Sequence, residues 1–168
     1  MGERVVSLGC SRWTAYALRR ALRGNEAAIP VCRIDESGYG HLIGEMSCPQ
    51  PTGTALRFQE SFSWPLNDAM RDGWFEGLPY PVADSRSQGF LGRNFARHHA
   101  SVLRVAEHPD DWSDDDILHV LSSVGFDLLG NLILGKAAYR QFFEQGAVRI
   151  ASVLTARLVG KVARLHLA

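Results

Sequence analysis

The sequence predicts an α+β fold in which small antiparallel hairpins precede short helices. Short β-branched runs separated by glycine-containing turns occupy much of residues 5–46, a pattern typical of hairpins. Apolar residues at helical spacing follow Ser113, a residue type that favours helix N-caps. The 168 residues, 46% hydrophobic and 21% charged, allow one globular domain, or one domain and a fragment.

Charge and cysteine content exclude several classes of protein. Lys and Arg total 18 and Asp and Glu total 18, so a strongly basic nucleic-acid binder is not indicated. Three cysteines without a CxxC pair favour free thiols in a reducing compartment over a disulfide framework. The sequence shows neither a signal-peptide core nor an apolar run of the roughly 20 residues that span a bilayer. We therefore expect a soluble cytoplasmic protein without a membrane partner.

The first two predicted strands form a hairpin. Residues 5–8 (VVSL) are apolar and β-branched, residues 9–12 have turn composition, and residues 13–18 (WTAYAL) supply the second strand. A lone hairpin is only marginally stable in water. We therefore expect it to pack on another part of the protein, and to expose an apolar patch where that part is absent.

A second hairpin is expected from residues 29–34 and 41–46, joined by a turn at residues 35–40 that contains two glycines. Residues 55–58 are a candidate third strand. Residues 58–83 then combine six aromatic residues with three prolines. This composition predicts an ordered but irregular segment whose aromatic side chains are buried.

Helices are expected in the second half of the chain. The first begins at Gly89, and the second covers residues 113–124, with acids in its first turn that oppose the helix dipole and Gly125 at its end. Residues 131–135 are a short strand or turn, and residues 136–145 a short helix. The predicted apolar side of the first helix comprises Phe90, Leu91, Phe95 and Val102.

The charged residues are unevenly distributed. Residues 107–116 contain six acids, whereas residues 146–168 contain four bases and no acid. The latter have apolar residues at helical spacing and predict a basic amphipathic helix. Three interpretations stay open: the helix packs on the body, it binds a membrane surface or acidic partner, or it is not native to the fold.

Motifs for common chemistries are missing from the sequence. It contains no GxxxxGK[ST], GxGxxG or GxSxG pattern. His108-Pro109-Asp110 imitates the start of a kinase catalytic loop, but the required Asn and DFG do not follow. Cys32, His41 and Cys48 are a conceivable zinc set, although buried thiols and an exposed histidine are favoured. A distant Cys–His pair stays open. We therefore assign no catalytic, cofactor or metal residue.

From Gly77 onward the sequence resembles HipA-like serine/threonine kinase toxins, in the branch fused to an N-terminal winged helix. GLPY and DSRSQGFLGR stand where that branch has "GLP…DLRPQGFLGR", and DDWSDDD and NLILG follow in the same order. Ser85, Ser87 and Asn131 depart from the usual Leu, Pro and Asp. The residues that match the family motifs are Gly77, Leu78, Pro79, Asp84, Arg86, Gln88, Gly89, Phe90, Leu91, Gly92, Arg93, Asp111, Trp112, Ser113 and Asp114.

The resemblance, which covers roughly residues 4–145, implies a division of the chain. Residues 1–24 would be a remnant of the wing hairpin, residues 25–145 the N-terminal subdomain that leans on the kinase domain, and residues 146–168 a basic helix or non-native tail. The family's ATP-binding and catalytic motifs lie further downstream and are not in this sequence. ATP and Mg²⁺ would therefore be needed only where a kinase core is present. We expect that the chain is truncated or frameshifted before those motifs.

The resemblance implies an accessory subdomain of a type II toxin–antitoxin kinase. The chain would be non-catalytic alone and would dock on a HipA-like kinase core, with aromatic residues of 62–80 as anchors. An inhibitory, antitoxin-like role is conceivable, and residual phosphotransfer is the least favoured interpretation. The alternative is a DNA-associated regulator fragment that binds DNA weakly or not at all. Its phosphate contacts would come from Arg4, Arg12, Arg19, Arg20 and Arg23.

Overall fold

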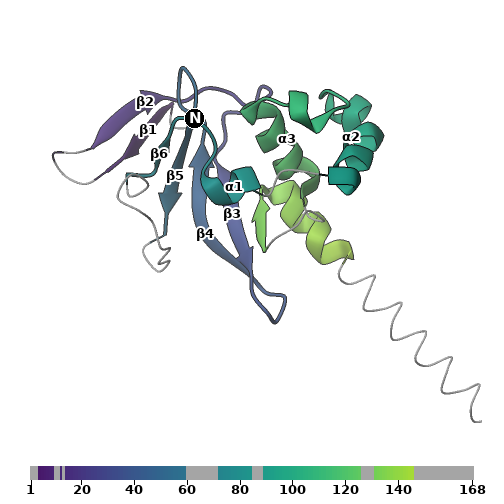
Figure 1. The fold of residues 1–168 in the computed structure, drawn as a ribbon. Helices are drawn as coiled ribbons and strands as arrows, with labels where there is room; N and C mark the ends of the chain where they lie inside the picture. Colours follow the sequence, from purple (N-terminus) through teal and green to yellow (C-terminus); the bar gives the residue numbers. More distant parts are fainter. Residues whose placement is uncertain are drawn as a thin grey trace, which may run out of the picture.

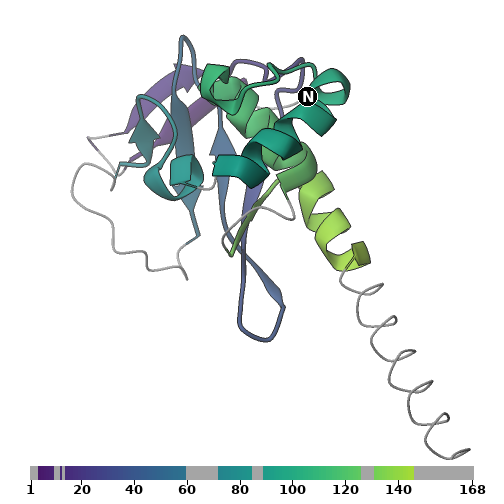
Figure 2. The same ribbon diagram turned by 45° about the vertical axis from the view of Figure 1, so that its right-hand side comes forward.

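The computed structural model describes residues 4–9, 12, 14–59, 72–84, 89–125 and 131–145, and only the backbone of residues 89–93. This part of the chain forms an antiparallel five-stranded sheet, a separate two-stranded ribbon and several short helices (Figure 1). The predicted α+β fold is therefore confirmed. The turned view in Figure 2 shows the helices on one side of the sheet and the ribbon on the other.

The ribbon consists of β1 (Val5–Leu8) and β2 (Ala15–Leu18), which pair antiparallel with Val5 opposite Leu18. Alternate residues of β1 point to opposite faces. Val6 and Leu8 are buried against Ala55 of the main sheet, with Trp74 packed beside them. The predicted hairpin is thus confirmed, whereas its origin as the wing of a winged helix stays a prediction.

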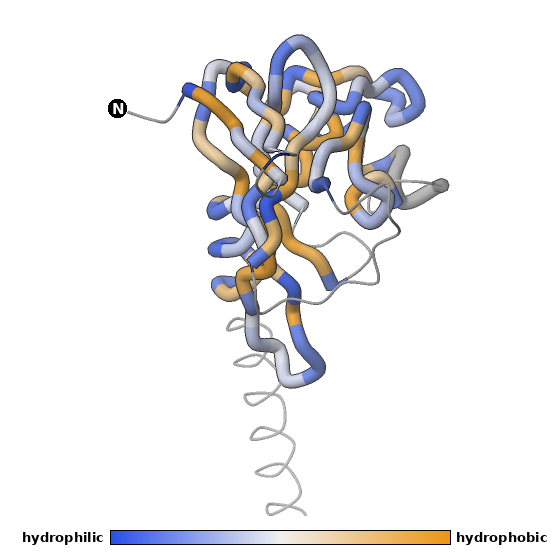
Figure 3. Tube along the Cα trace, turned by 90° about the vertical axis from the view of Figure 1, so that its left-hand side faces the viewer, coloured by the Kyte–Doolittle hydropathy of each residue, from blue (hydrophilic) through white to orange (hydrophobic). Residues whose placement is uncertain are grey.

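The main sheet has the strand order β6-β5-β4-β3-β7. Its strands are β3 (Ile29–Ile34), β4 (Gly40–Ser47), β5 (Thr54–Phe58), β6 (Trp74–Phe75) and β7 (Leu132–Leu134). The predicted second hairpin corresponds to β3 and β4, and its turn is held by the Asp35 carboxylate, which accepts hydrogen bonds from the Ser37 and Tyr39 amides at 2.9 Å each. Figure 3 shows the hairpin tip as hydrophilic.

The helices are α1 (Tyr80–Asp84), α2 (Gly89–Leu103), the 3-10 turn η3 (Pro109–Asp111), α3 (Asp114–Val124) and a helix at residues 136–145. The three helices predicted within residues 89–145 are confirmed, and the predicted basic helix at 146–168 lies outside the described residues. Where the chain is described, no helix is both long and apolar enough to cross a membrane.

Two expectations about side-chain burial are wrong. Val102 of α2 is 78% exposed, because the buried side of this helix is formed by Ala96, Ala100 and Leu103 instead. Tyr80, expected in a buried irregular segment, begins α1 and is 68% exposed. Pro81 is compatible with this short helix because the first helical turn does not need its missing N–H.

The main core lies between the helices and one face of the sheet. Leu56 of β5 belongs to it, together with Met46 of β4 and Leu118 of α3. The neighbouring Ala55 points the other way, into the cluster under the ribbon. The two faces of β5 therefore join two packed layers, the helices on one side and the ribbon on the other.

We predict that Leu118→Ala lowers the free energy of unfolding by about 3 kcal/mol, because Leu118 is fully buried and its truncation leaves a cavity. Urea unfolding monitored by circular dichroism would measure the change. The exposed control Val102→Ala should change the free energy by no more than about 0.5 kcal/mol. Equal effects of the two substitutions would contradict the core described above.

Candidate functional site

The first turn of α3 carries the acidic motif that the sequence analysis singled out. Ser113 is its N-cap, as predicted, and forms a capping box with Asp116. The Asp116 carboxylate accepts hydrogen bonds from the Ser113 amide at 3.1 Å and hydroxyl at 2.7 Å, while the Asp116 amide donates to Ser113 Oγ at 3.2 Å. These bonds satisfy backbone donors that the helix start leaves free.

Three consecutive acids at this helix start each face a different segment. A Cβ at Gly77 would lie 2.9 Å from Oδ2 of Asp114, so glycine permits the close approach of this segment. Asp115 pairs with Arg20, and Asp116 pairs with Arg23. We call these three aspartates and their partners the acidic junction. It joins segments that are far apart in the sequence.

Arg20 makes the most extensive contacts of the acidic junction. Its Nη1 and Nη2 both bind the Asp115 carboxylate, with Nη2 at 2.7 Å from Oδ1. Nε donates to the Pro49 carbonyl at 3.1 Å, and Nη2 donates to that of Gly53 at 3.3 Å. The hydrogen bond with Asp115 raises the pKa of Arg20 despite its partial burial. Two-pronged guanidinium–carboxylate pairs of this kind are among the stronger hydrogen-bonded contacts in proteins.

Arg23 is the second arginine of the acidic junction. Arg23 Nη2 binds Asp116 and also donates to the Arg104 carbonyl at 3.3 Å, which links residues 22–25 to the end of α2. Burial alone would raise the pKa of Asp116. The hydrogen bonds from Ser113 and Arg23 outweigh burial and hold this pKa below its ordinary value.

Several other family-motif residues are buried, packed on the main core or hydrogen-bonded. The Gly77 carbonyl accepts a hydrogen bond from Thr54 Oγ1 at 2.6 Å, Leu78 packs on the main core, and Pro79 is fully buried. Trp112 is buried, and its indole N–H donates to the Ala106 carbonyl at 2.7 Å. These motif residues therefore have structural roles.

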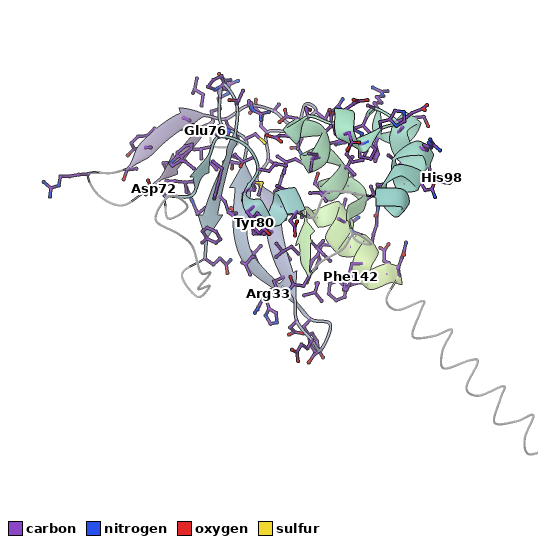
Figure 4. All side chains as sticks on the ribbon, in the orientation of Figure 1. Arg33, Asp72, Glu76, Tyr80, His98 and Phe142 are labelled. Atoms are coloured by element: carbon purple, nitrogen blue, oxygen red, sulfur yellow. The ribbon has the colours of Figure 1, made fainter. Side chains whose placement is uncertain are left out.

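The remaining motif residues are less informative. Asp84 and Asp111 are exposed, and Gly89, Phe90, Leu91, Gly92 and Arg93 form the first turns of α2. Arg86 and Gln88 lie outside the described residues. Of the proposed aromatic anchors, Phe62 and Trp64 also lie outside, Trp74 and Phe75 are half-buried, and Tyr80 projects outward (Figure 4).

The candidate DNA contacts divide into two groups. Arg4 and Arg12 are exposed. Arg20 and Arg23 are engaged in the acidic junction, and Arg19 Nη1 donates to the Glu26 carbonyl at 3.1 Å. The Asp115 and Asp116 carboxylates therefore already occupy part of the hydrogen-bonding capacity of Arg20 and Arg23.

The cysteines and histidines form no metal site in the described part of the chain, where no group of three or more His, Cys, Asp or Glu residues could hold an ion. Cys32 and Cys48 are buried free thiols, and burial raises the pKa of both. His41 Nε2 instead lies 2.7 Å from Asp35 Oδ2. His98 is exposed on α2 (Figure 4), and His99 stacks on Phe95 with ring centroids 4.5 Å apart.

An apolar groove that the sequence analysis missed lies between the β3–β4 hairpin and the helix at residues 136–145. Its volume is about 770 Å³. Its apolar lining includes Cys32, Leu42, Tyr139 and Phe143, and Lys136, Arg140 and Glu144 also line it. We call this the hairpin groove. The helical spacing of Tyr139 and Phe143 was visible in the sequence, but the strands opposite them lie about 100 residues earlier.

Comparison with known proteins identifies the family. Residues 25–143 match the family described as "YjjJ-like toxin, middle domain". The chain belongs to the YjjJ-like toxin family. It is 33% identical to Toxin YjjJ of Escherichia coli (strain K12) over an alignment of 141 residues. This alignment covers 83% of this chain and 30% of that relative. The chain thus spans less than a third of the relative's length. No solved structure matches it.

The match confirms that the chain belongs to a toxin family, as the sequence analysis expected. The sequence interpretation described residues 25–145 as an N-terminal subdomain, whereas the family description is that of a middle domain. The acidic junction links residues inside this YjjJ-like middle domain to Arg20 and Arg23, which precede it. The described residues between 4 and 24 are therefore packed on the matched domain and joined to it by ion pairs.

For the YjjJ-like chain, we predict that Arg20→Ala lowers the free energy of unfolding by about 2 kcal/mol, because it removes charged hydrogen bonds and leaves Asp115 unpaired. Chemical unfolding of Arg20→Ala, Asp115→Ala and the double variant would give a coupling energy of about 1 kcal/mol. Arg97→Ala, at an exposed position of α2, is the control. A coupling energy near zero would show that the pair does not stabilise the fold.

The lowered pKa of Asp116 predicts a pH-dependent contribution to stability. Its charged form stabilises the fold fully above the unfolded pKa of about 3.9, and this contribution is lost as the pH falls through the folded pKa. Asp116→Asn should lower the free energy of unfolding by about 1 kcal/mol at neutral pH. Urea unfolding across pH should show that this difference shrinks in acid. A constant difference would contradict the assignment.

Proposed function

We propose that this chain is a docking module of a HipA-like type II toxin kinase, non-catalytic by itself, which binds the kinase core through the hairpin groove. Two findings support the proposal: membership of the YjjJ-like toxin family and the middle-domain description of residues 25–143. The observation that carries it is the exposed apolar surface of the groove. ATP and Mg²⁺ enter this proposal only through the kinase core.

The hairpin groove has the composition of a protein-binding surface. Leu42 and Phe143 are each 39% exposed. The centroid of the Phe143 ring lies 4.8 Å from the centroid of the Tyr139 ring and 5.3 Å from that of Phe142. Lys136, Arg140 and Glu144 add charged groups to its lining. Apolar and aromatic centres with polar rims are typical of interfaces.

The groove is preformed by a close contact between its two walls. A Cβ at Gly40, the first residue of β4, would lie 2.5 Å from the Tyr139 ring. Glycine at this position therefore lets the ring lie directly on the hairpin. A surface held in this way loses little conformational entropy when a partner binds, which favours affinity.

The alternative of a DNA-associated fragment has less support. Two of its five candidate arginines are held in the acidic junction. The outward face of the ribbon also carries exposed apolar side chains, with Val5 at 43%, Tyr16 at 71% and Leu18 at 57%. Such a face fits a protein contact better than a phosphate backbone. A gel shift at low salt, where phosphate contacts are strongest, would revive the DNA alternative.

Isothermal titration against the kinase core from the same organism tests the docking proposal. Phe143→Ser should weaken binding at least about tenfold, because buried aromatic anchors dominate interfaces. Val102→Ser is the matched control, since it places the same polar residue on another exposed apolar position of a helix. Circular dichroism would verify that both variants fold.

Each outcome of these experiments tests a different part of the proposal. Absence of heat with the unmodified chain at high micromolar concentration would overturn docking altogether. Binding that survives Phe143→Ser unchanged would move the interface away from the hairpin groove. A phosphotransfer assay on the isolated chain should give no incorporation, and robust incorporation would contradict the non-catalytic assignment.

A further inference from the structure

A second cleft, separate in its chemistry from the hairpin groove, lies where residues 22–30, α3 and the start of the helix at 136–145 meet. Its volume is about 410 Å³, within the range of small-molecule sites. Leu22, Ala28, Ile29, Pro30 and Ala137 contribute apolar lining. We call it the polar cleft because of the side chains that line the rest: Arg23, Asn25, His119, Ser122, Ser123 and Lys136.

The polar cleft is rich in hydrogen-bond donors that other described residues do not use. Both side-chain hydrogen bonds of Arg23 leave from Nη2, so among described residues Nε and Nη1 have no acceptor. Asn25 accepts from the Ala27 amide through Oδ1 at 2.9 Å, and its NH₂ group has no acceptor among the described residues. Lys136 makes no ion pair with any described residue. Hydrogen-bond donors without partners favour a ligand that carries hydrogen-bond acceptors.

The charges of the cleft favour an anion. The described residues that line it include Arg23 and Lys136 but no Asp or Glu. Asp116 offsets part of the Arg23 charge from outside the lining, so Lys136 supplies the uncompensated positive charge. Burial and the nearby Arg23 lower the pKa of His119. His119, which is also hydrogen-bonded to the Leu103 backbone, is therefore neutral near pH 7 and adds no charge to the cleft.

The walls of the cleft are fixed before any ligand arrives. Gly135 has a φ of +82°, and a Cβ there would lie 2.7 Å from the Ser122 carbonyl oxygen of α3. The Gly135 amide also donates to the Pro30 carbonyl at 2.8 Å. These contacts hold the start of the helix against both α3 and β3. Lys136 therefore has its backbone at a set position beside Ser122 and Ser123.

We propose that the polar cleft binds a small organic phosphate. Lys136 and Arg23 would neutralise the phosphate, Asn25 and Ser123 would donate to its oxygens, and the apolar wall would contact the organic part. A phosphate group has enough acceptor oxygens for several converging donors, whereas a carboxylate has only two oxygens. The backbone N–H groups in the first turn of the helix at 136–145 add to the same preference.

NMR titration of the ¹⁵N-labelled chain tests this proposal, with inorganic phosphate and phenyl phosphate as probes at constant ionic strength. Both should give saturable shifts in amides of residues 23–30, 119–123 and 135–137, and phenyl phosphate should bind more tightly because it also fills the apolar wall. Lys136→Gln should weaken both about five- to tenfold. Arg97→Gln, at an exposed position of α2 that lines neither cleft, is the control and should leave binding unchanged.

Three results would overturn the proposal. The first is an absence of saturable shifts with either probe. The second is shifts confined to residues outside the polar cleft. The third is an equal loss of affinity in Lys136→Gln and Arg97→Gln, which would show a general effect of surface charge. Thermal unfolding of both variants verifies that they fold. Because the titration contains no kinase core, its result is independent of docking through the hairpin groove.

Discussion

The ion pair between Arg20 and Asp115 connects the segment between the ribbon and the main sheet to the first turn of α3. Arg20 follows β2, its amide donates to the Cys48 carbonyl after β4, and its guanidinium reaches the first turn of α3. The ribbon is also held by Val6 and Leu8 on Ala55. The Gln50 amide donates to the Leu18 carbonyl at 2.7 Å, and Arg57 Nη2 donates to the Ser7 carbonyl at 3.0 Å. A partly buried pair also disfavours other arrangements, because separation would leave a charge poorly solvated.

The run of three aspartates is explained by helix geometry rather than by catalysis. Successive residues on a helix point about 100° apart. Asp114, Asp115 and Asp116 therefore face three directions, towards Gly77, Arg20 and Arg23. Their position in the first turn also favours negative charge, because the N-terminal end of the helix dipole is positive. One short acidic motif thus stabilises its own helix and fixes three neighbouring segments.

The sequence was sufficient for features with local causes and insufficient for those that depend on distant contacts. The Ser113 cap, the glycine-containing turn at 35–40 and the β3–β4 hairpin follow from neighbouring residues, and all were predicted. Val102 was wrongly predicted to be buried. The side of α2 that is buried includes two alanines, which give a weaker hydrophobic pattern in the sequence. The arginines of the acidic junction were interpreted as DNA contacts, since no local signal pairs Arg20 with a residue 95 positions away. Both clefts combine segments about 100 residues apart, from common residue types.

The helix at residues 136–145 contributes to both proposed binding surfaces. Tyr139 and Phe143 line the hairpin groove, while Ala137 lines the polar cleft and Lys136 borders both. Close contacts at Gly40 and Gly135 hold this short helix against the hairpin and against α3. A ligand in the cleft and a protein in the groove would therefore act on the same element and share the charge of Lys136. Thermodynamic linkage makes any such coupling reciprocal, so a phosphate that weakens docking must itself bind less tightly to the docked protein. An anion that neutralises Lys136 would weaken a partner that presents acids to the groove rim, and would have little effect on a purely apolar contact with Phe143.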